Sequence, residues 1–212
     1  MDVALFPIPN SVSFPGVPCP LHVFEPRYRQ MVRHCLEDDL YLGVCHTEKV
    51  LRSNTREQTL EEALSSNQST YKPCEVFSAG PVELVEELPD GRLMINVRTS
   101  VRLLLEEEKQ TLPFSIWRCR ELLDRDSDEQ AQLAMEQSKE KILTRLLAIT
   151  HGQEVIQAQL RSDHWQQMPA RDFSFAAAGM LVADPELAQQ LLETTDTRHR
   201  LEVLLSLLNT AT

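Results

Sequence analysis

The sequence predicts an α+β fold in which a small mixed sheet or partial barrel precedes a bundle of helices. Up to about residue 121, apolar residues occur in short runs separated by turn residues, as they do in strands. From residue 126 onward, apolar residues recur at helical spacing. The chain has 212 residues, of which 42% are hydrophobic, and this is enough to bury a core. We therefore expect two domains, residues 1–121 and residues 122–212.

Six strands are expected in the first domain, at residues 3–6, 40–46, 81–88, 92–98, 101–105 and 114–122. A Pro-Asp-Gly turn at residues 89–91 joins the third and fourth, since its glycine tolerates positive φ. The acidic residues 106–108 predict the turn between the last two strands. The polar segment at residues 51–72 predicts a loop, in which Thr59 and Glu62 can begin one short helix.

The segment FPGVPCPLHVFEPRYRQMV, residues 14–32, contains four prolines and then continues as a predicted helix. Proline fixes its own φ and biases the preceding residue toward extended geometry, so the chain up to Leu21 is expected to be a rigid, irregular strand. Pro26 suits the first turn of a helix. Apolar residues then recur at helical spacing and predict one buried face, formed by Tyr28, Met31, Val32 and Cys35.

Four helices are expected in the second domain. The first begins at Asp126, with Glu129 completing its cap, and ends at His151-Gly152. The second covers residues 172–183, the third begins at Asp184-Pro185, and the fourth is capped by Asp196. The residues expected on the buried faces of the first two helices are Ala131, Met135, Ser138, Ile142, Leu146, Ile149, Phe173, Ala177, Met180 and Leu181.

Charge and composition narrow the classes of partner. The formal net charge is -11, which opposes binding to the phosphates of nucleic acid or to an anionic membrane. The N-terminal residues do not resemble a signal peptide, and no stretch approaches the roughly 20 apolar residues of a membrane helix. Five cysteines without a C-x-x-C pair are typical of reduced thiols. We therefore expect a cytoplasmic protein that binds neither nucleic acid nor membrane.

Sequence motifs for catalysis and for cofactors are missing from these 212 residues. The six glycines are too widely spaced for a P-loop or a dinucleotide fingerprint, and neither G-x-S-x-G nor H-E-x-x-H occurs. His34-Cys35 and Cys45-His46 were considered as zinc ligands. Adjacent residues point in different directions, so each pair offers one ligand, and buried cysteines with outward histidines are the preferred interpretation. We expect no catalytic residue, no metal and no cofactor.

Three stretches carry a resemblance to a known family. ALFPIPNSVSFPGVPCPLHVFEPRYRQMVRHCL at residues 4–36 resembles the opening of the Lon protease N-terminal domain, with its F-P-G and F-E-P-R-Y motifs. VELVEELPDGRLMINVRTSVRLLL at residues 82–105 and AGMLVADPELAQQLLETTDTRHRLEVLLSLL at residues 178–208 resemble later parts of that domain. The resemblance implies a PUA-like β domain followed by a helical bundle, acting as the substrate-recognition region ahead of an ATPase and a Ser-Lys peptidase.

The chain departs from the family pattern in two respects. Members often have a G-T-x-A-x-[IV] strand where this chain reads VFSAGPV at residues 76–82, which leaves the pairing of that strand open. The motifs of the ATPase and the peptidase are not found, so the resemblance implies a stand-alone Lon-like domain. A similar domain occurs in cereblon, but the cysteine-rich domain that accompanies it there is not visible in this sequence.

The preferred hypothesis is a non-catalytic module that binds exposed or unfolded polypeptide segments through an apolar groove or an open sheet edge. It can act with a separate protease, and it can self-associate. Residues suggested for the rim of the groove are Phe14, Pro18, Arg27 and Tyr28. Each also has a structural interpretation: the two aromatic residues fit a core, the arginine fits a pair with Glu25, and the proline fits a stiff loop.

Two other hypotheses remain open at this stage. One is an unrecognised hydrolase, or a small-molecule-binding protein, that uses a cleft between the β domain and the helical bundle. No motif supports it. The other is an RNA-binding module, because PUA-like folds elsewhere bind RNA, but the net charge of -11 disfavours it.

Overall fold

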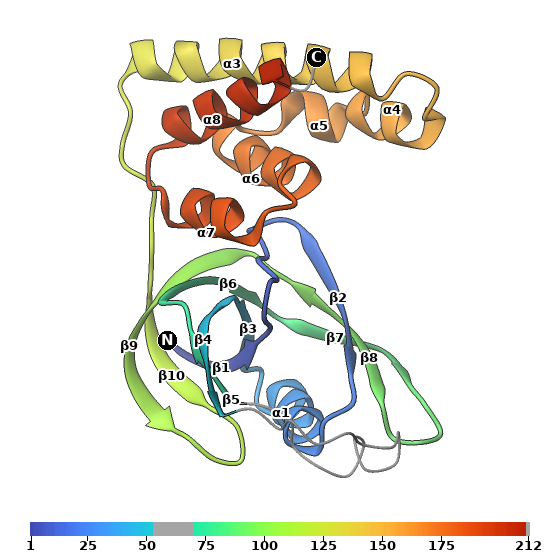
Figure 1. Ribbon diagram of the computed structural model, residues 1–212, viewed down its shortest axis with the longest axis vertical. Helices are drawn as coiled ribbons and strands as arrows, with labels where there is room; N and C mark the ends of the chain where they lie inside the picture. The colour runs from blue at the N-terminus through green and yellow to red at the C-terminus, as the bar shows by residue number, and fades with distance from the viewer. Residues whose placement is uncertain (53–69, 211–212) are drawn as a thin grey trace. The chain divides into compact units, whose positions relative to one another are not determined.

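The computed structural model describes residues 1–52 and 70–210 and contains two compact units, Met1–Leu122 and Leu123–Thr212. In the described residues, the first unit holds the strands and one helix, whereas the second consists of helices (Figure 1). The α+β fold expected from the sequence is confirmed. The short helix expected from Thr59 and Glu62 lies outside the described residues.

A closed barrel of five strands forms the centre of the first unit, in the order β1–β10–β9–β6–β3. β1 runs parallel to β3, and every other neighbouring pair is antiparallel. Figure 1 shows the strands curving around a common interior. The bounds are β1 Asp2–Pro7, β3 Tyr41–Cys45, β6 Val76–Gly80, β9 Val101–Gln110 and β10 Ile116–Glu121.

The barrel wall is packed on both of its faces. Val3 and Leu5 of β1 belong to the interior cluster, to which all five barrel strands contribute. Ala4 and Phe6, the alternate residues, belong to a second cluster outside the wall, which includes the buried face of the first helix. Successive residues of a strand point to opposite faces, so a strand with packing on both sides is apolar throughout. This explains the uninterrupted apolar runs in the sequence.

A second sheet lies outside the barrel, with the strand order β2–β8–β7. Its bounds are β2 Pro18–Val23, β7 Val82–Glu87 and β8 Leu93–Arg98. All six residues of β2 pair with β8, so the expectation of an irregular chain up to Leu21 is wrong from Pro18 onward. Because β2 is at the edge of this sheet, its prolines remove no required donor from the ladder.

Helix α1, Pro26–Glu37, packs its predicted face against the barrel wall: Tyr28, Met31, Val32 and Cys35 are all buried. Helix α1 also contacts the turn of the β7–β8 hairpin, where Arg29 Nη1 donates to the Gly91 carbonyl at 3.2 Å. Gly91 adopts φ 81°, as expected for the turn. Helix α1 is therefore fixed both to the barrel wall and to the β7–β8 turn.

Buried hydroxyl groups hold the proline-rich segment before β2 in place. The Thr99 hydroxyl donates to the Phe14 carbonyl at 2.8 Å, and the Thr99 carbonyl accepts from the Gly16 amide at 2.7 Å. The Ser78 hydroxyl donates to the Ser13 carbonyl at 2.7 Å. These bonds satisfy backbone groups that no strand partner reaches.

Replacing Pro26 with glycine is expected to lower the free energy of unfolding by about 1 kcal/mol. Pro26 occupies the first turn of α1, and Glu25 before it makes no side-chain cap hydrogen bond, so the fixed proline φ is the main local support of the helix start. Glycine would also increase the entropy of the unfolded chain. Urea denaturation measures the effect; an unchanged midpoint would contradict the prediction.

Two expectations about the strands need correction, and one open question is answered. The acidic residues 106–108 continue β9, which extends to Gln110, because this part of the strand still pairs with β10 and exposes its carboxylates to water. The polar segment at residues 51–72 begins and ends in a strand pair, β4 Thr47–Arg52 and β5 Thr70–Pro73. β6, the strand whose pairing the sequence left open, pairs with β3 on one side and β9 on the other.

The second unit is entirely helical in its described residues. The bounds are α3 Glu129–Ile149, α4 Glu154–Leu160, α5 Asp163–Gln167, α6 Ala170–Leu181, α7 Pro185–Glu193 and α8 Thr197–Thr210. The sequence did not predict α4 and α5, because helices of seven and five residues are too short to show a clear period. The third and fourth expected helices are confirmed as α7 and α8.

Details of α3 and α6 differ from the expectation. The N-cap of α3 is Asp128, which accepts from the Ala131 amide at 2.8 Å, rather than Asp126. Ile149 and Met180 were expected to be buried but are 51% and 40% exposed, because each lies at the edge of the buried side of its helix. Phe173, a predicted core residue of α6, is fully buried.

Arg200 of α8 is the largest fully buried side chain in the described residues. Its Nε donates to Ser174 Oγ at 2.9 Å, and its Nη1 donates to Asp124 Oδ1 at 3.0 Å and to the Thr194 carbonyl at 2.7 Å. Its Nη2 donates to Thr197 Oγ1 at 2.9 Å and to Asp124 Oδ2. A guanidinium has five N–H donors, so every donor of this buried cation has an acceptor.

Candidate functional site

A pocket of about 500 Å³ opens on the first unit and is formed by that unit alone. It is lined by residues of β1, α1, β5, β9 and β10 and of the connection between β9 and β10. We call it the barrel pocket. Its volume lies within the range of roughly 300–1,000 Å³ that is typical of ligand sites.

The walls of the barrel pocket are mainly apolar. The aromatic and aliphatic side chains that line it are Leu5, Tyr28, Tyr71, Leu105, Leu112, Phe114 and Trp117. Phe114 is 5% exposed, whereas Leu112 is 80% exposed. The pocket therefore extends from a buried floor to a lip from which an apolar side chain projects into water. Covering such an apolar surface with a ligand is energetically favourable.

Arg27 and Tyr28 form one side of the pocket. The Arg27 Nη2 atom lies 3.0 Å from Glu25 Oε2, and only 12% and 11% of the two side chains are exposed. The guanidinium carbon of Arg27 lies 4.5 Å from the centre of the Tyr28 ring. Burial raises the pKa of Tyr28, so its hydroxyl stays protonated at neutral pH. This wall presents an aromatic surface and a cation whose charge Glu25 compensates.

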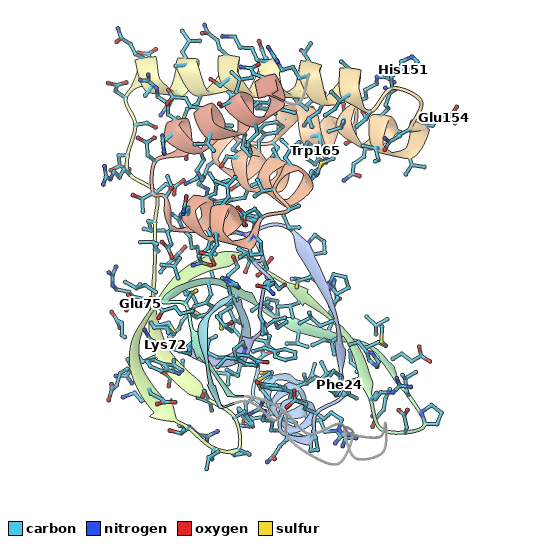
Figure 2. The ribbon with its side chains drawn as sticks, in the orientation of Figure 1. Phe24, Lys72, Glu75, His151, Glu154 and Trp165 are labelled. Atoms are coloured by element: carbon cyan, nitrogen blue, oxygen red, sulfur yellow. The ribbon has the colours of Figure 1, made fainter. Side chains whose placement is uncertain are left out.

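The other charged residues that line the pocket are Lys72, Glu75, Glu106 and Glu108. Lys72 Nζ donates to Glu48, and Figure 2 shows Lys72 and Glu75 at the same edge of the barrel. The hydrogen bond from Lys72 to Glu48 and the charges of Glu48 and Glu75 raise the pKa of Lys72.

The four residues suggested from the sequence do not lie together. Arg27 and Tyr28 line the barrel pocket, and the arginine makes the expected pair with Glu25. Phe14 is only 2% exposed and packs in the interior, while Pro18 is exposed on β2; neither lines this pocket. The structural interpretation of Phe14 and Tyr28 as buried residues is confirmed.

Sequence reasoning missed the residues at the mouth of the pocket. Tyr71 falls in the segment interpreted as a loop, and Trp117 was assigned only to a strand. Leu112 precedes Pro113 in a connection that gave no signal except the proline. The one sequence feature that could have indicated an exposed apolar lip is Leu112 itself, which stands beside Pro113 and shortly after the acidic residues 106–108.

The two dipeptides considered for zinc do not form a metal site. Cys35 and Cys45 are buried as expected, but His46 is also buried, because it connects β3 to β4 beside Cys74, whose amide donates to the His46 carbonyl at 2.8 Å. Burial raises the pKa of Cys35 to about 12 and raises that of Cys45 as well, which disfavours the thiolates that bind metals. Across the described part of the chain, no group of three His, Cys, Asp or Glu side chains could hold a metal ion.

Comparison with known proteins assigns the chain to a family. The sequence model of the ATP-dependent protease La (LON) substrate-binding domain matches residues 2–210, so the chain belongs to this family. The family is that of a substrate-recognition domain, as the sequence resemblance indicated.

Two solved structures share the fold. The N terminal domain of Mycobacterium avium complex Lon protease is similar over 100% of both chains, with a TM-score of 0.70 and 14% identity. The Lon N-terminal domain protein from Xanthomonas campestris is similar over 97% of this chain and 98% of its own, with a TM-score of 0.59 and 20% identity. Among the described helices of the present chain, none has the length and apolar character to span a membrane.

Proposed function

We propose that this chain binds exposed segments of unfolded or partly folded polypeptides in the barrel pocket, and that it does not itself cleave them. The observation that carries the proposal is an apolar pocket with an exposed lip on a chain of the Lon substrate-binding family. In this proposal the binding takes place in the cytoplasm, and a separate protease degrades the bound polypeptide.

Burial of apolar side chains supplies the affinity in this proposal. A leucine or phenylalanine side chain that enters the pocket gains roughly 1.5–3 kcal/mol. β5 pairs with β4 alone among the described strands, and Tyr71 and Lys72 of β5 line the pocket, so an extended segment can also form main-chain hydrogen bonds at its edge. Because ordering a flexible segment is costly, we expect weak and promiscuous binding.

Replacing Leu112 with serine is expected to weaken binding of an unfolded polypeptide by about tenfold, since the lip would lose most of the apolar surface that the ligand covers. Leu112 is 80% exposed, so the free energy of unfolding should change by no more than about 0.5 kcal/mol. Fluorescence anisotropy with a labelled, reduced and carboxymethylated protein measures the dissociation constant.

Val155→Ser is a matched control, because Val155 is 84% exposed and lies in the second unit, outside the barrel pocket. It should leave the dissociation constant unchanged. Equal affinities of the two variants would contradict the proposed site. Cleavage of the unfolded protein by the purified chain, with or without ATP, would contradict the non-catalytic part of the proposal.

A further inference from the structure

Among the described side chains around the barrel pocket, negative charges outnumber positive ones. Each cation in this set has a carboxylate partner: Arg27 pairs with Glu25, Lys72 with Glu48, and Arg120 with Glu106, the last at 3.5 Å. The lining residues Glu75 and Glu108 have no ion-pair partner within hydrogen-bonding distance in the described part of the chain. The polar group recorded at Glu108 is the Ser115 hydroxyl, which donates to its Oε1 at 3.4 Å.

The barrel fixes the relative positions of Glu75 and Glu108. The Glu75 carbonyl accepts from the Leu105 amide of β9 at 3.0 Å, so Glu75 lies beside Leu105. Glu108 lies three residues further along β9. The register of β9 shifts between these residues, so that Leu105 and Glu108 lie opposite Cys119 and Trp117, which are two residues apart on β10. At about 3.3 Å per residue, the two positions are separated by about 7 Å along the strands. The pocket surface between these two positions includes the apolar side chain of Leu105.

An aromatic ring, that of Trp117, lies next to Glu108. Trp117 of β10 lies directly opposite Glu108 of β9 in the antiparallel register, and both residues line the pocket. Opposite residues of an antiparallel pair have their side chains on the same face, with Cβ atoms about 5 Å apart. A cation bound by Glu108 would therefore come within reach of the indole, which is the best aromatic partner for a cation.

The surroundings of Glu75 also carry an excess of negative charge. The pKa of Lys72 is raised by the hydrogen bond and charge of Glu48, with a further contribution from Glu75. Two carboxylates thus surround one ammonium at that edge of the pocket, which leaves a net negative charge there.

From these observations we infer that the barrel pocket selects basic segments: an apolar side chain enters the pocket while a lysine or arginine on either side of it meets Glu75 and Glu108. This inference rests on the proposed function, and it adds the chemical class of the polypeptide. The occupant is an extended segment with flanking positive charges, which complements the excess of two carboxylates at the pocket and the net charge of -11 of the chain.

The test compares three short, unstructured peptides with a central phenylalanine. They differ only at the two positions that flank it at a distance of two residues, which carry lysine, glutamine or glutamate. At low ionic strength the lysine peptide is expected to bind about fivefold more tightly than the glutamine peptide, because two exposed charge pairs contribute a total of roughly 1 kcal/mol. The glutamate peptide should bind more weakly than both, and added salt should reduce the differences.

The double variant Glu75→Gln/Glu108→Gln should bind the lysine and glutamine peptides equally. Its matched control is Glu86→Gln/Glu121→Gln, which removes the same charge from exposed positions of the first unit outside the pocket. The control variant should keep the fivefold preference. A global effect of net charge would instead remove the preference in both variants, and that result would overturn the inference.

The outcomes distinguish this inference from the proposed function. If the three peptides bind the unmodified chain with equal affinity, and Leu112→Ser weakens all of them, peptide binding in the pocket stands and the selection of basic segments is wrong. A preference for lysine that persists in Glu75→Gln/Glu108→Gln also overturns the inference. If none of the three peptides binds, the proposed function itself fails.

Discussion

Replacing Arg200 with methionine is expected to lower the free energy of unfolding of the second unit by about 3–5 kcal/mol. Methionine keeps much of the length of the side chain but removes all five donors. Asp124, whose side chain is 10% exposed, would keep its charge and the hydrogen bond from the Thr197 hydroxyl but lose the guanidinium of Arg200. Removing one member of a buried ion pair costs more free energy than the intact pair contributes.

Arg198→Met on the same helix is the matched control. Arg198 pairs with Glu202 at 2.8 Å, but 60% of its side chain is exposed, so this change should leave the urea midpoint nearly unchanged. Urea denaturation measured by Trp165 fluorescence reports on this unit, because Trp165 is buried and the other tryptophan, Trp117, belongs to the first. The Trp117→Phe background removes the second signal. Equal midpoints for the two arginine variants would refute the buried-charge explanation.

A double variant separates the charge from the packing. In Arg200→Met/Asp124→Leu, the carboxylate is removed together with its partner. This variant should be more stable than Arg200→Met alone, because the buried carboxylate that lost the guanidinium is removed as well. Equal stabilities would show that loss of packing around Arg200, including its stacking 4.2 Å from the Phe175 ring centre, causes the whole effect.

Gly80→Ala is expected to destabilise the first unit by at least about 3 kcal/mol. A Cβ atom added at Gly80 would lie 1.9 Å from the Arg98 carbonyl oxygen and 2.6 Å from its carbon. These are backbone atoms, so no side-chain rotation can relieve the overlap. The end of β8 would have to move away from β6, which would break the bonds from the Arg98 amide to the Pro81 carbonyl and from the Ser100 amide to the Ala79 carbonyl.

Gly16→Ala tests the same substitution without the overlap. Gly16 has φ 79°, but no atom lies within 4 Å of an added Cβ. Its replacement should therefore cost only about 1 kcal/mol, from the unfavourable φ. Urea denaturation of both variants in a Trp165→Phe background, followed by Trp117 fluorescence, compares them in the first unit. If Gly80→Ala were no more destabilising than Gly16→Ala, close approach would not be the reason for glycine at position 80.

Part of the candidate site could be predicted from the sequence. Arg27 and Tyr28 were suggested for the rim of a groove, and both line the pocket. Phe14 and Pro18 were suggested from the same stretch, but one is buried and the other lies on β2, away from the pocket. Residues that are close in sequence need not share a surface. Here Phe14 lies in the connection before β2 and Pro18 begins β2, whereas Arg27 and Tyr28 belong to α1.

The sequence by itself determined the local features of this protein: the β-rich first part and helical second part, the buried face of α1, the β7–β8 hairpin and the family. These features depend on neighbouring residues, whose spacing can be read along the chain. Only the tertiary structure decided where the pocket lies and which charges remain uncompensated there. Packing of α1 and β5 beside the barrel brings Tyr28 and Tyr71 to the same pocket as Trp117 of β10. The ion pairs likewise depend on distances in space rather than on spacing in sequence.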